Sequence, residues 1–149
     1  MVTAKAGDGA IEIVDTVPAV LWVEVFAVFL LSHLVGDFLL QTDWQARHKF
    51  GGLGSNRESR RALLTHTFTY TLAFVPALVW LAPEIGAWVI GVAALIGLPH
   101  MVQDDGRLLG LYVSRVKGLG GQAPSGLRLA VDQTSHAVML FGLALLVTA

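Results

Sequence analysis

The sequence contains no cysteine and few charged residues. Without cysteine, disulfide bonds and thiolate metal sites are excluded, so any bound metal must use histidine and carboxylate ligands. Only 14% of the 149 residues are charged, against about 25% in an ordinary soluble domain. The sequence also has no phosphate-binding glycine loop, nucleophile elbow or nucleic-acid-binding motif. We therefore expect no nucleic-acid partner.

Hydrophobic residues make up 54% of the chain, and the mean hydropathy is +0.65. Four long apolar stretches each reach or approach the ~20 residues needed to cross ~30 Å of hydrocarbon. Continuous apolar runs, without alternation, favour helices, which satisfy their own backbone in lipid. The sequence thus predicts an all-α integral membrane four-helix bundle, and residues 1–149 form a single membrane domain. The predicted spans are residues 18–40, 62–81, 85–103 and 127–148.

The basic residues are unevenly distributed. Nine of the ten Lys and Arg residues lie in two groups, between residues 47 and 61 and between residues 107 and 128. By the positive-inside rule the loops at 41–61 and 104–126 are cytoplasmic, so both termini lie outside. This pattern predicts a multi-pass protein of the inner, cytoplasmic, membrane. Residues 1–17 carry a net negative charge and are expected to form a partly disordered extracytoplasmic tail.

Three local features refine this topology. The first cytoplasmic loop is rich in glycine between residues 51 and 54, which indicates a flexible connection. Pro76 predicts a kink in the second span, and a short turn at 82–84 joins it to the third. In the second loop, apolar residues between 108 and 116 share one helical arc bordered by basic residues. This arc predicts an interfacial helix on the cytoplasmic membrane surface, where membrane lipid is the expected partner.

Pairs of metal-ligating or hydrogen-bonding residues recur at a four-residue spacing. They are His33 with Asp37, His66 with Tyr70, His100 with Asp104, and Asp132 with His136. Residues four apart lie on one helical face, one turn above each other. In an up-down-up-down bundle all four pairs fall near the cytoplasmic helix ends at similar depth. The spacing therefore predicts one shared site at the cytoplasmic leaflet.

The charge of this site suggests a metal. Its three aspartates have no Lys or Arg beside them within the helices, and a charge at the bilayer centre costs roughly 2.5–3.5 kcal/mol. A divalent cation would offset them: zinc is the first choice, with manganese and iron as alternatives. The predicted metal ligands are His33, Asp37, His66, His100, Asp104, Asp132 and His136. The candidate catalytic residues are Asp37, Asp104 and Asp132, and the candidate contacts to the ligands or to a bound molecule are Gln41, Tyr70 and Gln133.

These features favour a metal-dependent membrane hydrolase of a lipid-like substrate. A metal with one open position lowers the pKa of bound water to about 7, and a nearby carboxylate accepts the proton. Other functions stay open: a divalent cation or proton transporter or relay, a structural membrane subunit with a metal-free polar network, and haem binding through paired histidines. A polar site on one side only argues against transport, and the adjacent carboxylates argue against haem. A homodimer is a further expectation for so small a chain.

The motif His33-Leu34-Val35-Gly36-Asp37-Phe38-Leu39-Leu40-Gln41, with the later pairs, resembles a bacterial and phage membrane family known as domain of unknown function three-three-zero-seven. The family's first motif, His-Leu-x-Gly-Asp-Phe-x-x-Gln, and its last, Asp-Gln-x-x-x-His, are both present, and the likeness covers roughly residues 31–140. The third motif differs, because Gln103 and Asp105 replace Ile and Tyr and Arg107 takes the Lys position. The resemblance implies the same site and assigns no activity. The extra acid at 105 is expected either to alter the charge at the metal or to face water.

Overall fold

The computed structural model describes residues 4–7, 10–13, 20–119 and 122–149. Helix α1 (Trp22–Leu34) runs directly into a π-helix, η1 (Val35–Leu40). The Glu24 carboxylate accepts a hydrogen bond from the backbone N–H of Leu21 at 3.1 Å, which caps the exposed start of α1. The π-helix contains Asp37, and such wider turns often mark functional sites.

The first connecting loop, 41–61, is more ordered than the glycine pattern predicts. It contains a short helix, α2 (Asp43–His48), which packs against the following helix. The Thr42 side chain accepts from the backbone of Gln45, and the Gln45 side chain accepts from the backbone of Thr42. This reciprocal cap explains why α2 begins where it does.

The second predicted span is a bent pair of helices, α3 (Arg57–Ala73) and α4 (Val75–Ile85). The Asn56 side chain caps the start of α3 by accepting two backbone N–H bonds. The axes of the two helices differ by 58° across the break at Phe74. Pro76 has no N–H for the preceding turn, which accounts for the break and confirms the predicted kink.

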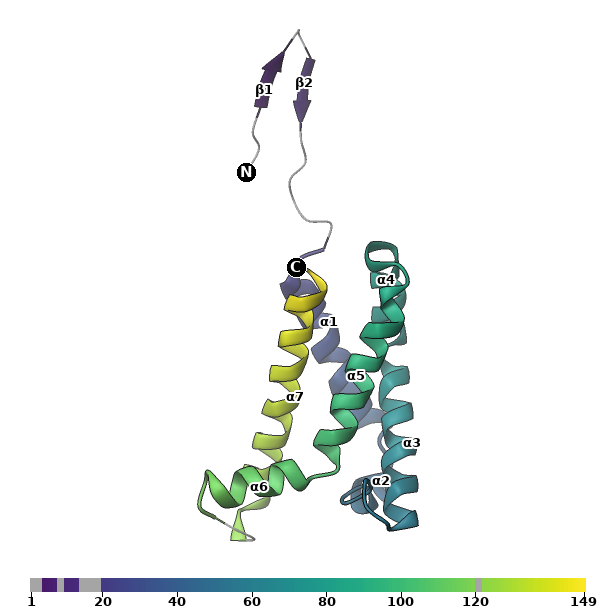
Figure 1. Cartoon of the computed structure of the whole chain (residues 1–149), viewed down its shortest axis with the longest axis vertical. Helices are drawn as coiled ribbons and strands as arrows, with labels where there is room; N and C mark the ends of the chain where they lie inside the picture. Colours follow the sequence, from purple (N-terminus) through teal and green to yellow (C-terminus); the bar gives the residue numbers. More distant parts are fainter. Residues whose placement is uncertain (1–3, 8–9, 14–19, 120–121) are drawn as a thin grey trace.

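Helices α5 (Trp88–Asp104), α6 (Arg107–Arg115) and α7 (Ser125–Val147) complete the chain. The turn before α5 lies at Gly86, with φ of +57°, because α4 continues through the segment 82–84 where the sequence predicted the turn. Helix α6 lies across the lower end of the molecule, between α5 and α7 (Figure 1). A helix in the second loop was expected, and its crosswise course fits an interfacial position.

The N-terminal segment holds two short strands that the sequence analysis did not predict. Strand β1 (Ala4–Gly7) pairs antiparallel with β2 (Ala10–Ile13), with Ala4 opposite Ile13. The rest of the predicted 1–17 tail, residues 1–3, 8–9 and 14–17, lies outside the described residues.

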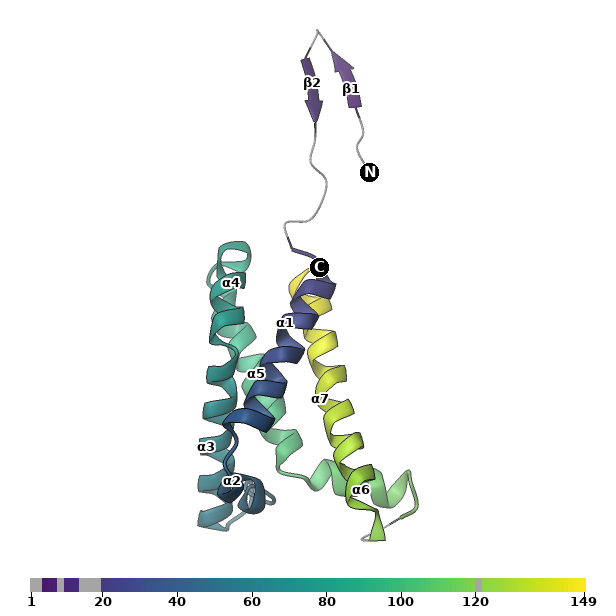
Figure 2. The same cartoon turned by 180° about the vertical axis from the view of Figure 1, so that it is seen from behind.

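The helices from Trp22 onward pack around one core. Helix α1 starts against α7 and ends, through η1, against α3, while α5 contacts both α3 and α7 (Figures 1 and 2). The core between them is built from buried residues such as Phe29, Phe74, Ile96 and Leu140. Tyr70, a member of one of the site pairs, belongs to this core.

The membrane prediction is supported in part. Residues Trp22–Leu40 and helix α7 are long and apolar enough to cross a membrane, and the bent pair α3 and α4 makes a third span if it counts as one. Helix α5 is apolar but only 17 residues long. The lengths and composition of these helices indicate association with a membrane, and the complete four-span bundle stays a prediction.

Candidate metal centre

Four of the predicted ligands meet in the interior. Asp37 comes from η1, His66 from α3, and His100 and Asp104 from successive turns of α5. One ligand atom from each lies within 4.8 Å of all the others, and none of the four residues is more than 7% exposed. The i, i+4 spacing on α5 places its two side chains on the face that looks toward α3.

The spacing of these atoms is that of a small ion's coordination shell. His66 Nε2 lies 3.2 Å from Asp37 Oδ1, 2.9 Å from Asp104 Oδ2 and 3.1 Å from His100 Nε2. His100 Nε2 lies 3.6 Å from Asp37 Oδ1 and 3.1 Å from Asp104 Oδ2. Four ligands held about 2.0–2.1 Å from a tetrahedral zinc ion would be about 3.3 Å apart. The donor set and its spacing therefore fit a divalent cation.

A second observation concerns acceptors that have no donor. His136 Nδ1 lies 2.9 Å from the backbone carbonyl of Asp132, and a carbonyl only accepts, so Nδ1 carries the hydrogen. If the ring carries this hydrogen alone, its Nε2 is bare, and that atom lies 3.7 Å from Asp104 Oδ1. Both atoms, and Asp37 Oδ1, are buried without a hydrogen-bond partner. A cation or an added proton would satisfy them.

Lys49 is the member of the cluster that sequence reasoning missed. Its Nζ donates to Asp104 Oδ2 at 2.8 Å, and the Lys49 side chain is 9% exposed. The charge pattern of the sequence places Lys49 in a cytoplasmic basic loop. Here it supplies part of the positive charge that we expected from a metal alone.

The loop that carries Lys49 is held by Asp105. The Asp105 carbonyl accepts from the backbone N–H of Gly51 at 2.9 Å, and its Oδ1 accepts from the backbone N–H of Leu53 at 2.7 Å. Its Oδ2 pairs with Arg107 Nε at 3.1 Å. Asp105 is only 3% exposed, so the expectation that it faces water was wrong. Its role is to anchor the loop.

His33 lies beside the four ligands and is engaged on both ring nitrogens. Its Nε2 lies 3.0 Å from Gln133 Oε1, and its Nδ1 lies 3.1 Å from the Tyr70 hydroxyl. If Gln133 accepts at Oε1, the hydrogen of His33 is on Nε2, and Nδ1 accepts from Tyr70. The Gln133 amide nitrogen lies 3.4 Å from both Asp37 Oδ2 and Asp132 Oδ2. Gln133 therefore contacts one oxygen of Asp37, Oδ2, while the other oxygen, Oδ1, faces His66.

Tyr70 also positions His100. The two rings stack with centroids 3.3 Å apart and planes 2° apart. A Cβ at Gly36 would lie 2.7 Å from a carbon of the Tyr70 ring, so only glycine there allows η1 to approach α3 this closely.

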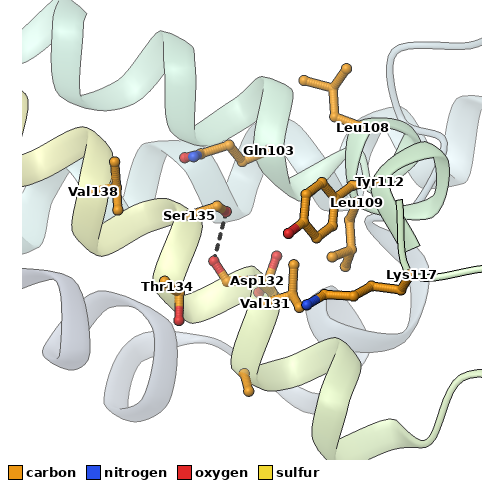
Figure 3. A pocket seen from close by; sticks show the side chains of 11 residues that line it. Gln103, Leu108, Leu109, Tyr112, Lys117, Val131, Asp132, Thr134, Ser135 and Val138 are labelled. Atoms are coloured by element: carbon orange, nitrogen blue, oxygen red, sulfur yellow. Dashed lines mark hydrogen bonds between the residues drawn. The ribbon is translucent and has the colours of Figure 1, made fainter. Parts of the chain in front are cut away.

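Two cavities border the site. A cavity of about 700 Å³ lies between α5, α6 and α7, and its lining includes Asp132, Gln103 and Lys117 (Figure 3). A second cavity of about 470 Å³ lies between α1 and α7 and reaches His33 and Gln133. The two cavities therefore reach residues next to the four ligands, on the two sides of α7, while the ligands themselves are in neither lining.

One protein-family model matches most of the chain. The model of the family described as "Protein of unknown function (DUF3307)" matches residues 25–149. The chain belongs to this family. The searches of curated proteins and of solved structures found no match. The DUF3307 match agrees with the resemblance carried by the motifs and covers every residue of the site.

The DUF3307 site residues divide into groups that the spacing alone did not separate. Asp37, His66, His100 and Asp104 form the ligand group; His33, Tyr70 and Gln133 form the hydrogen-bond network beside it. His136 faces Asp104 from α7, and Asp132 is half-buried at the wall of the larger cavity. Gln41 is half-buried just after η1, with its amide nitrogen unpartnered. Three aspartates without a basic residue in the helices require positive charge from elsewhere, and a lysine in the adjoining loop could have been predicted on that ground.

Proposed function

We propose that this protein is a metal-dependent hydrolase embedded in the inner, cytoplasmic, membrane, acting on a lipid-like substrate. The observation that carries the proposal is the buried group of two imidazole and two carboxylate ligand atoms, drawn from three helical elements. Zinc suits this donor set, and manganese and iron are alternatives. Helices α1, α3 with α4, α5 and α7 would cross the membrane, with both termini outside and the site near the cytoplasmic leaflet.

The residues take distinct roles in this proposal. Asp37, His66, His100 and Asp104 would hold the metal. Because four protein ligands complete a tetrahedral shell, an activated water would need a fifth position, as in five-coordinate zinc or six-coordinate manganese or iron. Asp132 is the aspartate that lines the large cavity, and it accepts the proton released during hydrolysis. Lys49 donates to Asp104 Oδ2, so its ammonium offsets part of the charge of that carboxylate and repels a metal ion held there.

The Lys49–Asp104 pair also favours a second candidate, a metal-free proton relay. With neutral histidines, the carboxylates of Asp37 and Asp104 outweigh the single ammonium by one negative charge. One proton shared among the facing imidazoles of His66 and His100 would balance the cluster, and their Nε2 atoms are 3.1 Å apart. Such a chain could move protons or serve as a structural polar network.

Metal analysis separates the two candidates. Tag-free protein, purified in detergent, is analysed by inductively coupled plasma mass spectrometry, beside H66A, H100A, H33A and a control, H48A. His48 lies outside the cluster, next to Glu58. We expect one bound divalent ion per chain in the native protein and in H48A, loss of the ion in H66A and H100A, and weaker but measurable binding in H33A. A folded native protein that stays metal-free after incubation with zinc, manganese and iron would refute the hydrolase and favour the relay.

A further inference from the structure

The cavity between α5, α6 and α7 is lined by a mixture of apolar and polar side chains. Leu108, Leu109, Val131 and Val138 give it an apolar lining, while Gln103, Tyr112, Ser135 and two charged residues give it a polar one (Figure 3). Its volume of about 700 Å³ is in the range of small-molecule sites, roughly 300–1,000 Å³. A ligand that matches it must be amphiphilic.

The two charged residues are Asp132 on α7 and Lys117 after α6. Figure 3 shows the Lys117 side chain extending toward the α7 wall that carries Asp132. Among the described residues, no N···O contact of 4.0 Å or less joins this ammonium to this carboxylate. The cavity therefore offers one positive and one negative group that do not neutralise each other by direct contact. A ligand with both charges would complement them.

The side chain of Gln103 indicates which kind of cationic group the ligand carries. The Gln103 side chain lines the cavity, but its carbonyl oxygen has almost no exposed surface and no hydrogen-bond partner, so a ligand reaches this oxygen only after the side chain rotates. An ammonium with N–H donors would satisfy this oxygen, whereas a quaternary ammonium would leave it unpaired. The hydroxyl of Ser135 donates to the Asp132 carbonyl and so keeps its lone pairs free for the same ligand.

We infer that this cavity binds a zwitterionic phospholipid whose head group carries a primary ammonium and a phosphodiester. In this inference the ammonium of the head group lies between Asp132 and Gln103, and the phosphate faces Lys117. The part of an acyl chain nearest the head group lies along Leu108 and Val138. The membrane is the source of this ligand, because α6 and α7 border the cavity with exposed leucine and valine side chains. The role of this lipid as a substrate rests on the proposed hydrolase function, but its binding does not.

Photo-crosslinking tests the inference. The full chain is reconstituted into phosphatidylcholine vesicles doped with a photoactivatable phosphatidylethanolamine, and labelled peptides are identified by mass spectrometry. We expect labelling of α6 and α7 that unlabelled phosphatidylethanolamine displaces and that phosphatidylglycerol and added phosphatidylcholine do not. K117Q and D132N should each reduce labelling by roughly tenfold, as loss of one charge-assisted contact would. R115Q, which changes a residue outside the cavity lining, should label like the native protein.

Three outcomes would overturn the inference. Equal displacement by phosphatidylglycerol, with labelling unchanged in D132N, would mean that the cavity takes an anionic lipid. If phosphatidylcholine displaces the label equally well, the ligand does not need N–H donors. If K117Q labels like the native protein, Lys117 does not contact the phosphate. Because Lys117 is exposed, K117Q should fold even if D132N does not. Protein treated with a chelator should label equally, so failure of the metal proposal and failure of lipid binding give different results.

Discussion

Replacing Lys49 by glutamine tests how the cluster balances its charge. The Lys49 ammonium lies 2.8 Å from Asp104 Oδ2, and both side chains are at least nine-tenths buried. At an effective dielectric constant of about 20, two unit charges at this distance attract by about 6 kcal/mol before desolvation is counted. Measured losses on removing one partner of a buried pair are about 3–5 kcal/mol, because the other charge is left uncompensated.

The expected result depends on whether metal is present. In chelator-treated protein, K49Q should lower the free energy of unfolding by about 3–5 kcal/mol, since Asp104 loses its cation. Saturating zinc should recover most of this loss, because the ion supplies positive charge to the same carboxylate. The native protein should gain less from zinc, since its lysine and the ion repel each other. Zinc should therefore bind more tightly to K49Q than to the native protein.

Thermal and denaturant unfolding in detergent, each with chelator and with zinc, measures both quantities. R47Q is the matched control, because the Arg47–Asp43 pair lies two residues before Lys49 but is exposed, with side chains 72% and 76% accessible. Such surface pairs contribute about 0–1 kcal/mol. Equal stability of K49Q and native protein without metal, or an equal gain from zinc in both, would refute the reasoning.

Three further substitutions follow from the contacts around the ligands. G36A should destabilise the protein by about 1–3 kcal/mol in thermal unfolding, because its Cβ would meet the Tyr70 ring at 2.7 Å, whereas G142A, with open space around it, should not. Y70F should cost about 1–3 kcal/mol by leaving buried His33 Nδ1 without its donor, and a native stability would contradict that bond. D105A removes the acceptor that holds the loop after α2, so backbone amide exchange in that loop should rise at least tenfold; unchanged exchange would show that the loop is held by other contacts.

The position of the site was predictable because it depends on local geometry. A spacing of four residues keeps two side chains on one face of any α-helix, and apolar runs locate the helices. His100 and Asp104 illustrate this, since their side chains lie 3.1 Å apart on α5. The predicted kink at Pro76 follows equally from the chemistry of one residue.

The division between ligands and supporting residues was not predictable in the same way. In η1 the backbone widens to a π-helix, so the relation of His33 to Asp37 differs from an α-helical one, and no periodicity of side chains signals this change. The partner that engages His33 Nε2 is Gln133, which lies 100 residues later in the chain. Such contacts depend on helix packing, which local patterns do not specify.

Lys49 and Asp105 belong to one arrangement. Asp104 accepts the Lys49 ammonium, and the next residue, Asp105, accepts the backbone N–H of Leu53 from the same loop. The end of α5 therefore holds both the carboxylate of the site and the segment that delivers its counter-charge. Because adjacent residues make both contacts, the end of α5 determines where the carboxylate and the lysine meet. Asp105 thus acts on the charge of the site through the position of this loop.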